Sequence, residues 1–172
     1  MIKLIEILTG IIRDPFNGEI SQLKYLDEDI SHVANTKKYD KDLTIYKLDA
    51  KDPNITFPDS LEVNGKLYIA YSNILKFPKF LKVKNLELFS CEMEDNLFDS
   101  KLLIEGNLGM SSVSYKGNNL IRSLITPEMG DVSKYIKYPG ESYGLSQPVV
   151  DKVRDLIEQR GGYVKGEIII QY

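Results

Sequence analysis

Residues 81–93 read LKVKNLELFSCEM, and this stretch decides the fold of the chain. Glu87 separates Leu86 from Leu88, and Cys91, the only cysteine among 172 residues, follows three positions later. Because strand side chains alternate between two faces, Leu86 and Leu88 are predicted to share one face of a strand. The spacing to Cys91 and Met93 predicts that the chain then turns and points inward again.

The same pattern recurs on both sides of this stretch. Its other copies are Leu43-x-Ile45-x-x-Leu48-x-Ala50, Leu67-x-Ile69-x-x-Ser72-x-Ile74 and Leu108-x-Met110-x-x-Val113-x-Tyr115. The four copies start 24, 19 and 22 residues apart. A second pattern occurs three times, as Val63-x-Gly65-x-Leu67, Ile104-x-Gly106-x-Leu108 and Val164-x-Gly166-x-Ile168. Repetition at a spacing of roughly 20 residues predicts stacked repeats.

These units resemble leucine-rich repeats of the short class, about 20 residues long. That class is familiar from secreted bacterial effectors and, in degenerate form, from phage-encoded proteins. The resemblance covers residues 43–115 and a last repeat near Ile168. It implies a turn position in each repeat, at which the family prefers Asn or Cys. Cys91 and the small polar Ser72 fit this preference, whereas Leu48 and Val113 depart from it. It implies a solenoid whose sheet has parallel strands at residues 43–46, 67–70, 86–89 and 108–111.

The repeats are predicted to form the middle of one α+β domain that spans residues 1–172. Residues 1–42 are expected to be an N-terminal helical cap, with an apolar helix that Asp14-Pro15 ends and a second helix over residues 20–34. Residues 116–172 are expected to hold an irregular segment and a C-terminal helix-strand unit. That helix opens at Ser146-Gln147-Pro148 and ends at Gly161-Gly162, a proline-first and glycine-last arrangement typical of helices.

The composition excludes several classes of protein. A net charge of -3 and a pI near 5.3 are unlike those of nucleic-acid binders, which carry a basic face. A single cysteine excludes an internal disulfide and a Cys-pair zinc site. The first residues lack the pattern of a signal peptide, and their apolar run is too short to span a bilayer. We therefore expect a cytoplasmic protein with no cofactor and no metal.

Catalytic patterns are sparse. Residues 140–144 match G-x-S-x-G around Ser142, the turn that presents a hydrolase nucleophile. No histidine follows Ser142, although that mechanism needs one, so a hydrolase is a remote alternative. Cys91 is expected to be structural, because a thiol inside a repeat packs as a small hydrophobe. No catalytic residue is assigned.

The strand face carries the functional expectation. Tyr46, Tyr68, Glu87 and Phe89 are predicted to point outward from neighbouring repeats and to form an aromatic patch, and aromatic side chains often anchor protein partners. In the alternative interpretation the terminal segments cover this face. The favoured function is a non-enzymatic interaction module that binds a protein partner, in the manner of a phage or mobile-element product that acts on a host factor. The alternative is a structural or assembly subunit that oligomerises through its caps.

Overall fold

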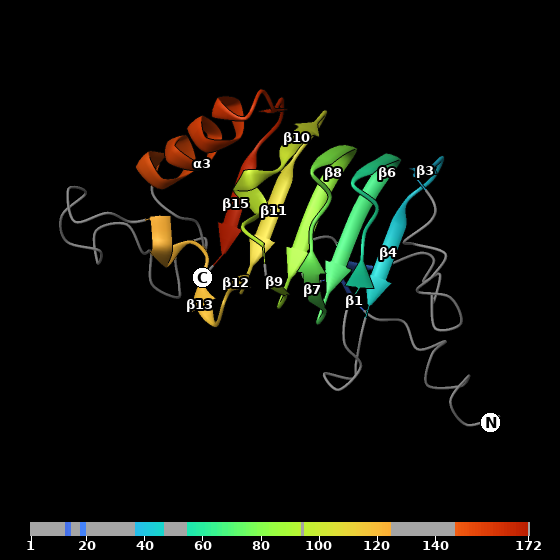
Figure 1. Ribbon diagram of the computed structural model, residues 1–172, viewed down its shortest axis with the longest axis horizontal. Coiled ribbons are helices and arrows are strands. Elements are labelled where there is room, and N and C mark those ends of the chain that lie inside the picture. The colour runs from blue at the N-terminus through green and yellow to red at the C-terminus, as the bar shows by residue number, and fades with distance from the viewer. Residues whose placement is uncertain are drawn as a thin grey trace.

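The computed structural model describes residues 13–14, 18–19, 37–46, 55–93, 95–124 and 147–171, and every structural statement below concerns these residues. Figure 1 shows a series of roughly parallel strands with one helix near the C-terminus, α3 (Gln147–Gln159), beside the strands at one end. The protein is therefore of the α/β class, with mainly parallel sheets.

The parallel strands form three rows, which we number in the order in which the chain meets them. Row one consists of β3 (Lys38–Tyr39), the first half of β6 (Ser60–Ala70), the first half of β8 (Phe80–Phe89), β10 (Lys101–Ile104) and β14 (Tyr163–Val164). Row two consists of β4 (Leu43–Tyr46), the second halves of β6 and β8, β11 (Leu108–Ser111) and β15 (Ile168–Gln171). Row three consists of β5 (Ile55–Thr56), β7 (Asn73–Lys76), β9 (Glu92–Met93) and β12 (Ser114–Tyr115).

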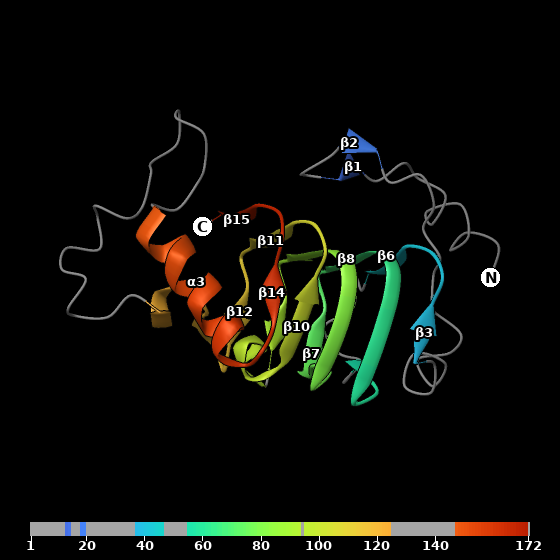
Figure 2. The ribbon, with the colours of Figure 1, turned by 90° about the horizontal axis from the view of Figure 1, so that it is seen from above.

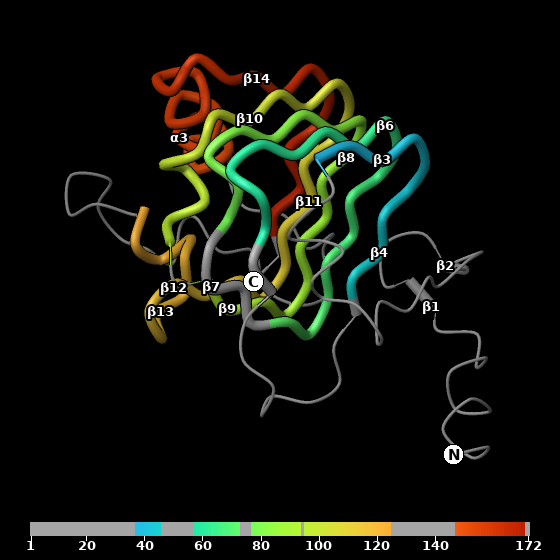
Figure 3. Tube along the Cα trace, turned by 45° about the vertical axis from the view of Figure 1, so that its right-hand side comes forward, coloured from blue at the N-terminus to red at the C-terminus, as the bar shows by residue number. Residues whose placement is uncertain are grey.

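The chain runs through rows one, two and three repeatedly, and we call each such run a pass. Every pass adds one strand to each row, except the last pass, which adds strands to rows one and two only. Figure 3 shows successive passes of the chain lying one behind another. The predicted strands of row two are confirmed, because Leu43, Leu67, Leu86 and Leu108 are register partners in parallel strands. Ile168 continues the same register in β15, as the last repeat was expected to do.

The interior lies between the rows. Leu86 and Leu88 are fully buried, as the alternation predicts. Row one contributes the matching ladder Leu61, Leu81 and Leu102, whose members pair across adjacent strands. The Phe-Pro steps lie between row three and row one, and the rings of Phe57 and Phe77 contact each other edge to face at 5.9 Å. Burial of these apolar ladders is what holds the passes together.

The turn between row two and row three repeats in every described pass. Ser72, Cys91 and Val113 point into the core at this position. The residues before them, Tyr71, Ser90 and Ser112, all have positive φ, between 47° and 52°. Val113 departs from the polar preference, yet its turn keeps the same backbone, because Ser114 donates its amide to the Cys91 carbonyl at 2.9 Å.

The corner between row one and row two is built from an Asx residue and a glycine. The side chains of Asp42, Asn85 and Asn107 each precede the first row-two residue and accept an amide hydrogen bond from the next pass, at 2.7 to 2.9 Å. Gly65, Gly106 and Gly166 lie against these oxygens, and a Cβ at any of them would approach backbone atoms of the neighbouring pass within 2.7 to 2.9 Å. The recurrent glycine is therefore explained by the close approach of the neighbouring pass at this corner, which leaves no room for a side chain.

The predicted N-terminal helical cap is wrong for its described residues: Lys38–Tyr39 is strand β3 of row one, and residues 13–14, 18–19 and 37–42 contain no helix. Arg13 was expected to end a helix, but Arg13–Asp14 is strand β1 and pairs antiparallel with β2 (Gly18–Glu19). The two strands flank Pro15 and Asn17, residue types that favour reversal of the chain over continuation of a helix. Residues 1–12 of the predicted helix and the whole of the second one, residues 20–34, lie outside the described residues.

The C-terminal prediction is confirmed for the helix. Helix α3 buries Val149, Val153 and Ile157 in the core and lies across the end of the rows beside β14 and β15, as Figure 2 shows. The final segment is two strands rather than one, because the Gly166 corner divides β14 from β15. The described part of residues 116–146 holds β13 (Asn118–Asn119) and the short helix η2 (Arg122–Leu124); a second short helix, η1 (Leu97–Asp99), precedes β10.

Candidate interaction surface

Alternate residues of the row-two strands point away from the core. They form the outer face of row two. Two lines of residues run across the strands. One line is Thr44, Tyr68, Glu87, Gly109 and Ile169, and the other is Tyr46, Ala70, Phe89 and Ser111. Of the four residues predicted for partner binding, Tyr68, Glu87 and Phe89 therefore occupy one face, and the side chain of Tyr46 lies outside the described part. Tyr68 and Phe89 fall on different lines, so they are diagonal neighbours and not direct register partners.

The expected exposure of Tyr68 is wrong. Its side chain is only 3% exposed, although it is not part of the hydrophobic core. Tyr68 sits on a central strand, with Thr44 and Glu87 as its register partners on the two sides. Ala70, Gly109 and Ser111 are buried as well. The outer face is therefore covered at this part of row two, and the terminal segments that the alternative interpretation places over it lie in part outside the described residues.

Glu87 is held by an ion pair. The Lys66 Nζ atom lies 3.0 Å from Glu87 Oε1 and 3.2 Å from Oε2, and the two side chains are 25% and 12% exposed. A Cβ at Gly109 would come within 3.3 Å of Glu87 Cγ, so the absence of a side chain there makes room for the Glu87 stem. Glu87 is therefore a positioned, charge-paired group on this face.

The exposed aromatic group of the face lies at its edge, beside the turn into row three. The Tyr71 ring is 48% exposed and meets the half-buried Phe89 ring edge to face, with centroids 5.1 Å apart and an interplanar angle of 80°. The sequence reasoning missed Tyr71. Its signal was an aromatic residue at the position where the next two passes carry Ser90 and Ser112.

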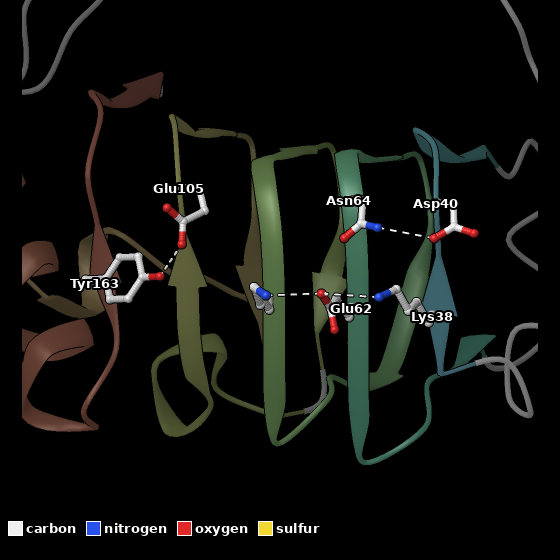
Figure 4. Close-up of polar contacts among 7 residues, drawn as sticks. Lys38, Asp40, Glu62, Asn64, Glu105 and Tyr163 are labelled. Carbon is white, nitrogen blue, oxygen red and sulfur yellow. Dashed lines mark hydrogen bonds and ion pairs between the residues drawn. The ribbon is translucent and has the colours of Figure 1, made fainter.

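The outer face of row one is polar and its charges are paired across passes. Figure 4 shows Glu62 beside Lys38 and Asn64 beside Asp40; the ion-pair distance from Lys38 to Glu62 is 3.8 Å, and Asn64 donates to Asp40 at 3.2 Å. Lys82, on the neighbouring strand β8, lies 3.1 Å from the same Glu62 oxygen. The hydrogen bond from Lys82 lowers the pKa of the Glu62 carboxyl. These groups are solvent-exposed, and such pairs contribute little stability.

The same face continues to the last pass. There Glu105 accepts hydrogen bonds from Lys165 and from the Tyr163 hydroxyl. The bond from Lys165 is the main cause that lowers the pKa of Glu105, and the bond to Glu105 raises the pKa of both Tyr163 and Lys165. Row one thus presents matched charges and no unpaired cluster of one sign among these residues.

The described residues contain no arrangement that suggests catalysis. Burial raises the pKa of the Cys91 thiol to about 11, which keeps it protonated and poorly nucleophilic. No group of three potential metal ligands occurs among these residues, and the Asp99 carboxylate is paired with Arg160 at 3.0 Å. Ser142 and His32 lie outside the described part. None of the described helices is long and apolar enough to cross a membrane.

No protein-family model, curated protein or solved structure matches this chain.

Proposed function

We propose that the chain is a non-enzymatic interaction module that binds a protein partner through the outer face of row two. The observation that carries this proposal is the exposed Tyr71 ring stacked on Phe89. Large aromatic side chains dominate the binding energy of many protein interfaces. The stacking holds both rings in place before binding, so less conformational entropy is lost when a partner arrives.

The proposed architecture supports this role. We propose that the three rows form a short β-solenoid of the parallel β-helix type, since every described pass repeats the same strands and corners in register. Solenoids display extended surfaces that many of their members use for recognition. The repeat resemblance adds the proposal of a cytoplasmic phage or mobile-element protein whose partner is a host factor.

The anchor on this surface is proposed to be Phe89 together with Tyr71, with the Glu87 carboxylate at its margin. Tyr68 and Tyr46 remain in the proposed surface as neighbours on the same face. Because Tyr68 is buried, truncating it disturbs the fold, and it is unsuitable as a test of binding.

The test is a comparison of three variants for capture of a partner from host lysate and then for affinity. Tyr71→Ala and Phe89→Ala are each expected to weaken binding about thirtyfold, the change that corresponds to the loss of an anchor residue. Phe80→Ala is the matched control, because Phe80 is also a half-buried aromatic residue but lies on the outer face of row one. Equal affinity of all three folded variants would move the binding surface away from row two.

The second candidate is an assembly subunit that oligomerises through its ends. The observation that favours it is the terminal strand β15, whose outer edge has no strand partner among the described residues. Light scattering on the purified chain separates the two candidates, because only the second requires a stable oligomer.

A further inference from the structure

Asn64 and Gly65 form the corner between the two halves of β6, and both lie outside the regular ladders. The ladder to β8 pairs Val63 and resumes at Lys66, and the ladder to the first pass resumes at Leu67. Neither Asn64 nor Gly65 has a register partner among the described residues. Such an interruption leaves backbone groups outside the hydrogen-bonded ladder.

The Asn64 side chain is exposed on the outer face of row one. Its Nδ2 atom donates a hydrogen bond to Asp40 Oδ1 at 3.2 Å, a contact that Figure 4 shows. Lys66, two residues later, is fixed to the first pass, because its amide donates to Asp42 Oδ1 at 2.7 Å. The Asn64 carboxamide is therefore accessible to water beside a fixed corner.

The residue after Asn64 has no side chain for a reason that lies in the fold. A Cβ at Gly65 would come within 2.7 Å of the Asp42 amide nitrogen. A side chain at this position would also hinder the approach of the Gly65 nitrogen to the Asn64 carboxamide. Close packing of the corner thus places an unhindered backbone nitrogen next to an exposed asparagine. At the two equivalent corners the residue before the glycine is Glu105 or Lys165, neither of which carries a carboxamide.

We propose that Asn64 is a site of spontaneous deamidation in the folded chain. The backbone nitrogen of Gly65 attacks Cγ of Asn64, and a bond forms between these two atoms. The bond from Cγ to Nδ2 breaks, and Nδ2 leaves as ammonia with the proton that the Gly65 amide loses. The product is a cyclic succinimide, and the step involves no oxidation or reduction.

Water completes the reaction by opening the ring at either of its two carbonyl carbons. Attack of water at Cγ restores the normal main chain and leaves aspartate at position 64. Attack at the former backbone carbonyl carbon leaves isoaspartate, in which the main chain runs through Cβ and Cγ. Either product carries one negative charge that asparagine lacks.

Both products change the contact with Asp40. A carboxylate takes the place of the donating Nδ2 atom, so that like charges meet where a hydrogen bond had been. Because both groups are exposed, this change alone costs little stability. Isoaspartate also lengthens the main chain by one carbon directly before Gly65, at a corner where even a Cβ would collide with the first pass. It is therefore expected to loosen β6 from the first pass.

The proposal does not depend on the proposed function. The reacting atoms lie at the corner between row one and row two, whereas the Tyr71 and Phe89 rings lie beside the turn into row three. Partner binding can therefore fail while deamidation occurs, and deamidation can fail while binding occurs.

The experiment is incubation of the full, folded chain at neutral and at mildly alkaline pH, followed by peptide mass mapping. The peptide with Asn64 is expected to lose its amide and to give two acidic products that separate on chromatography. Conversion should be faster at the higher pH, because the attacking nitrogen must lose its proton. Mapping also separates this site from Asn17, which glycine likewise follows.

Asn107 is the matched control within the same chain. It is exposed too, but Leu108 follows it, and its Oδ1 atom accepts the Glu167 amide at 2.9 Å. Its amide should stay intact over the period in which Asn64 converts. Asn64→Gln should abolish acid formation at position 64, since the longer side chain closes the corresponding ring far less readily.

Thermal unfolding measures the structural consequence. Aged wild-type protein that contains isoaspartate is expected to have a lower melting temperature than fresh protein. Its melting temperature should also lie below that of Asn64→Asp, which reproduces the charge but not the longer main chain. Asn64→Gln incubated in parallel should keep its original melting temperature, because its main chain stays unchanged.

Two outcomes overturn the site. The first is an Asn64 amide that stays intact in the folded chain at both pH values. The second is conversion of Asn107 at the same rate as Asn64. Equal melting temperatures of the aged protein and of Asn64→Asp would overturn the effect assigned to the longer main chain.

Discussion

The side-chain oxygen of Asn85 accepts a hydrogen bond from the backbone amide of Asn107 at 2.8 Å, and Asn107 repeats the contact one pass later on Glu167, at 2.9 Å. The corners of the third and fourth passes are thus each tied to the next pass by an asparagine. Lys66 occupies the equivalent position in the second pass and carries no acceptor. The corner that follows it is one residue shorter, and the register between β6 and β8 shifts there.

Removal of one corner contact should have a small and measurable effect. Asn107→Ala leaves the Glu167 amide without its acceptor and is expected to lower the free energy of unfolding by about 1 kcal/mol, the usual net contribution of such a bond. Asn64→Ala is the control, because that exposed side chain contacts only the Asp40 side chain. Urea denaturation of both variants checks the difference, and equal midpoints would contradict it.

The corner glycines should tolerate no side chain. At Gly166 a Cβ would lie 2.2 Å from Asn107 Oδ1 and 2.7 Å from backbone atoms of Gly106. Gly166→Ala is therefore expected to lower the melting temperature strongly, since neighbouring backbone must move. Gly109→Ala is the matched comparison, because its Cβ would meet only the flexible Glu87 stem, at 3.3 Å. A larger loss in Gly109→Ala than in Gly166→Ala would count against the close-approach explanation.

Arg154 should be a stabilising residue. Arg154→Ala leaves the Val164 and Gly166 carbonyls without the guanidinium that donates to both. Hydrogen bonds to charged groups contribute roughly 1.5–3 kcal/mol each. We expect a loss of about 3 kcal/mol in the free energy of unfolding, the lower end of the sum, because the bond to Gly166 is long at 3.3 Å. Arg154→Lys should recover only part of it, because lysine lacks the planar fork that reaches two acceptors. Arg160→Ala is the control, since its exposed pair with Asp99 contributes little. Thermal and chemical unfolding of the three variants measure these losses, and an equal loss in Arg154→Ala and Arg160→Ala would contradict the prediction.

Leu88 tests the core of the repeats. It has no exposed surface and its register partners Ile69 and Met110 are buried too. Leu88→Ala is expected to cost roughly 2–5 kcal/mol of unfolding free energy, as truncation of buried leucines generally does. A cost below 1 kcal/mol, measured by equilibrium denaturation, would mean that row two packs loosely.

Cys91 gives a prediction for alkaline pH. Burial holds the pKa of its thiol near 11 in the folded chain, against 9.0 for an unperturbed thiol. Between these values the unfolded state releases the proton and the folded state keeps it, so this group's contribution is fully present below pH 9 and is lost as pH rises toward 11. Wild-type protein should therefore lose stability faster than Cys91→Ala over this range, and parallel profiles would contradict the assignment. In native protein at neutral pH the thiol should resist labelling until denaturant is added.

The local sequence pattern was sufficient to predict the strands of row two, the turn that follows them and the C-terminal helix. The alternation at Leu86 and Leu88 has a period of two over a strand of four residues, and its recurrence at matched spacing implies parallel stacking. The turn position of Cys91, the helix after Pro148 and the last strand at Ile168 follow from equally local signals. Row three was missed because strands such as β9 and β12 have only two residues, too few to show alternation. Row one does alternate, as at Leu81 and Val83, but within β6 and β8 it continues directly into row two, so no local signal separates the two rows.

By itself the sequence determined which residues face the interior of each pass, because side-chain alternation and turn chemistry are properties of consecutive residues. Only the tertiary structure decided what covers or pairs with the surface. Tyr68 points outward by its alternation and is nevertheless buried, because exposure depends on segments distant in sequence. Arg154 reaches Val164 and Gly166 only because α3 packs against the last pass. Pairing across passes is a contact between distant residues, and no local pattern encodes its partner.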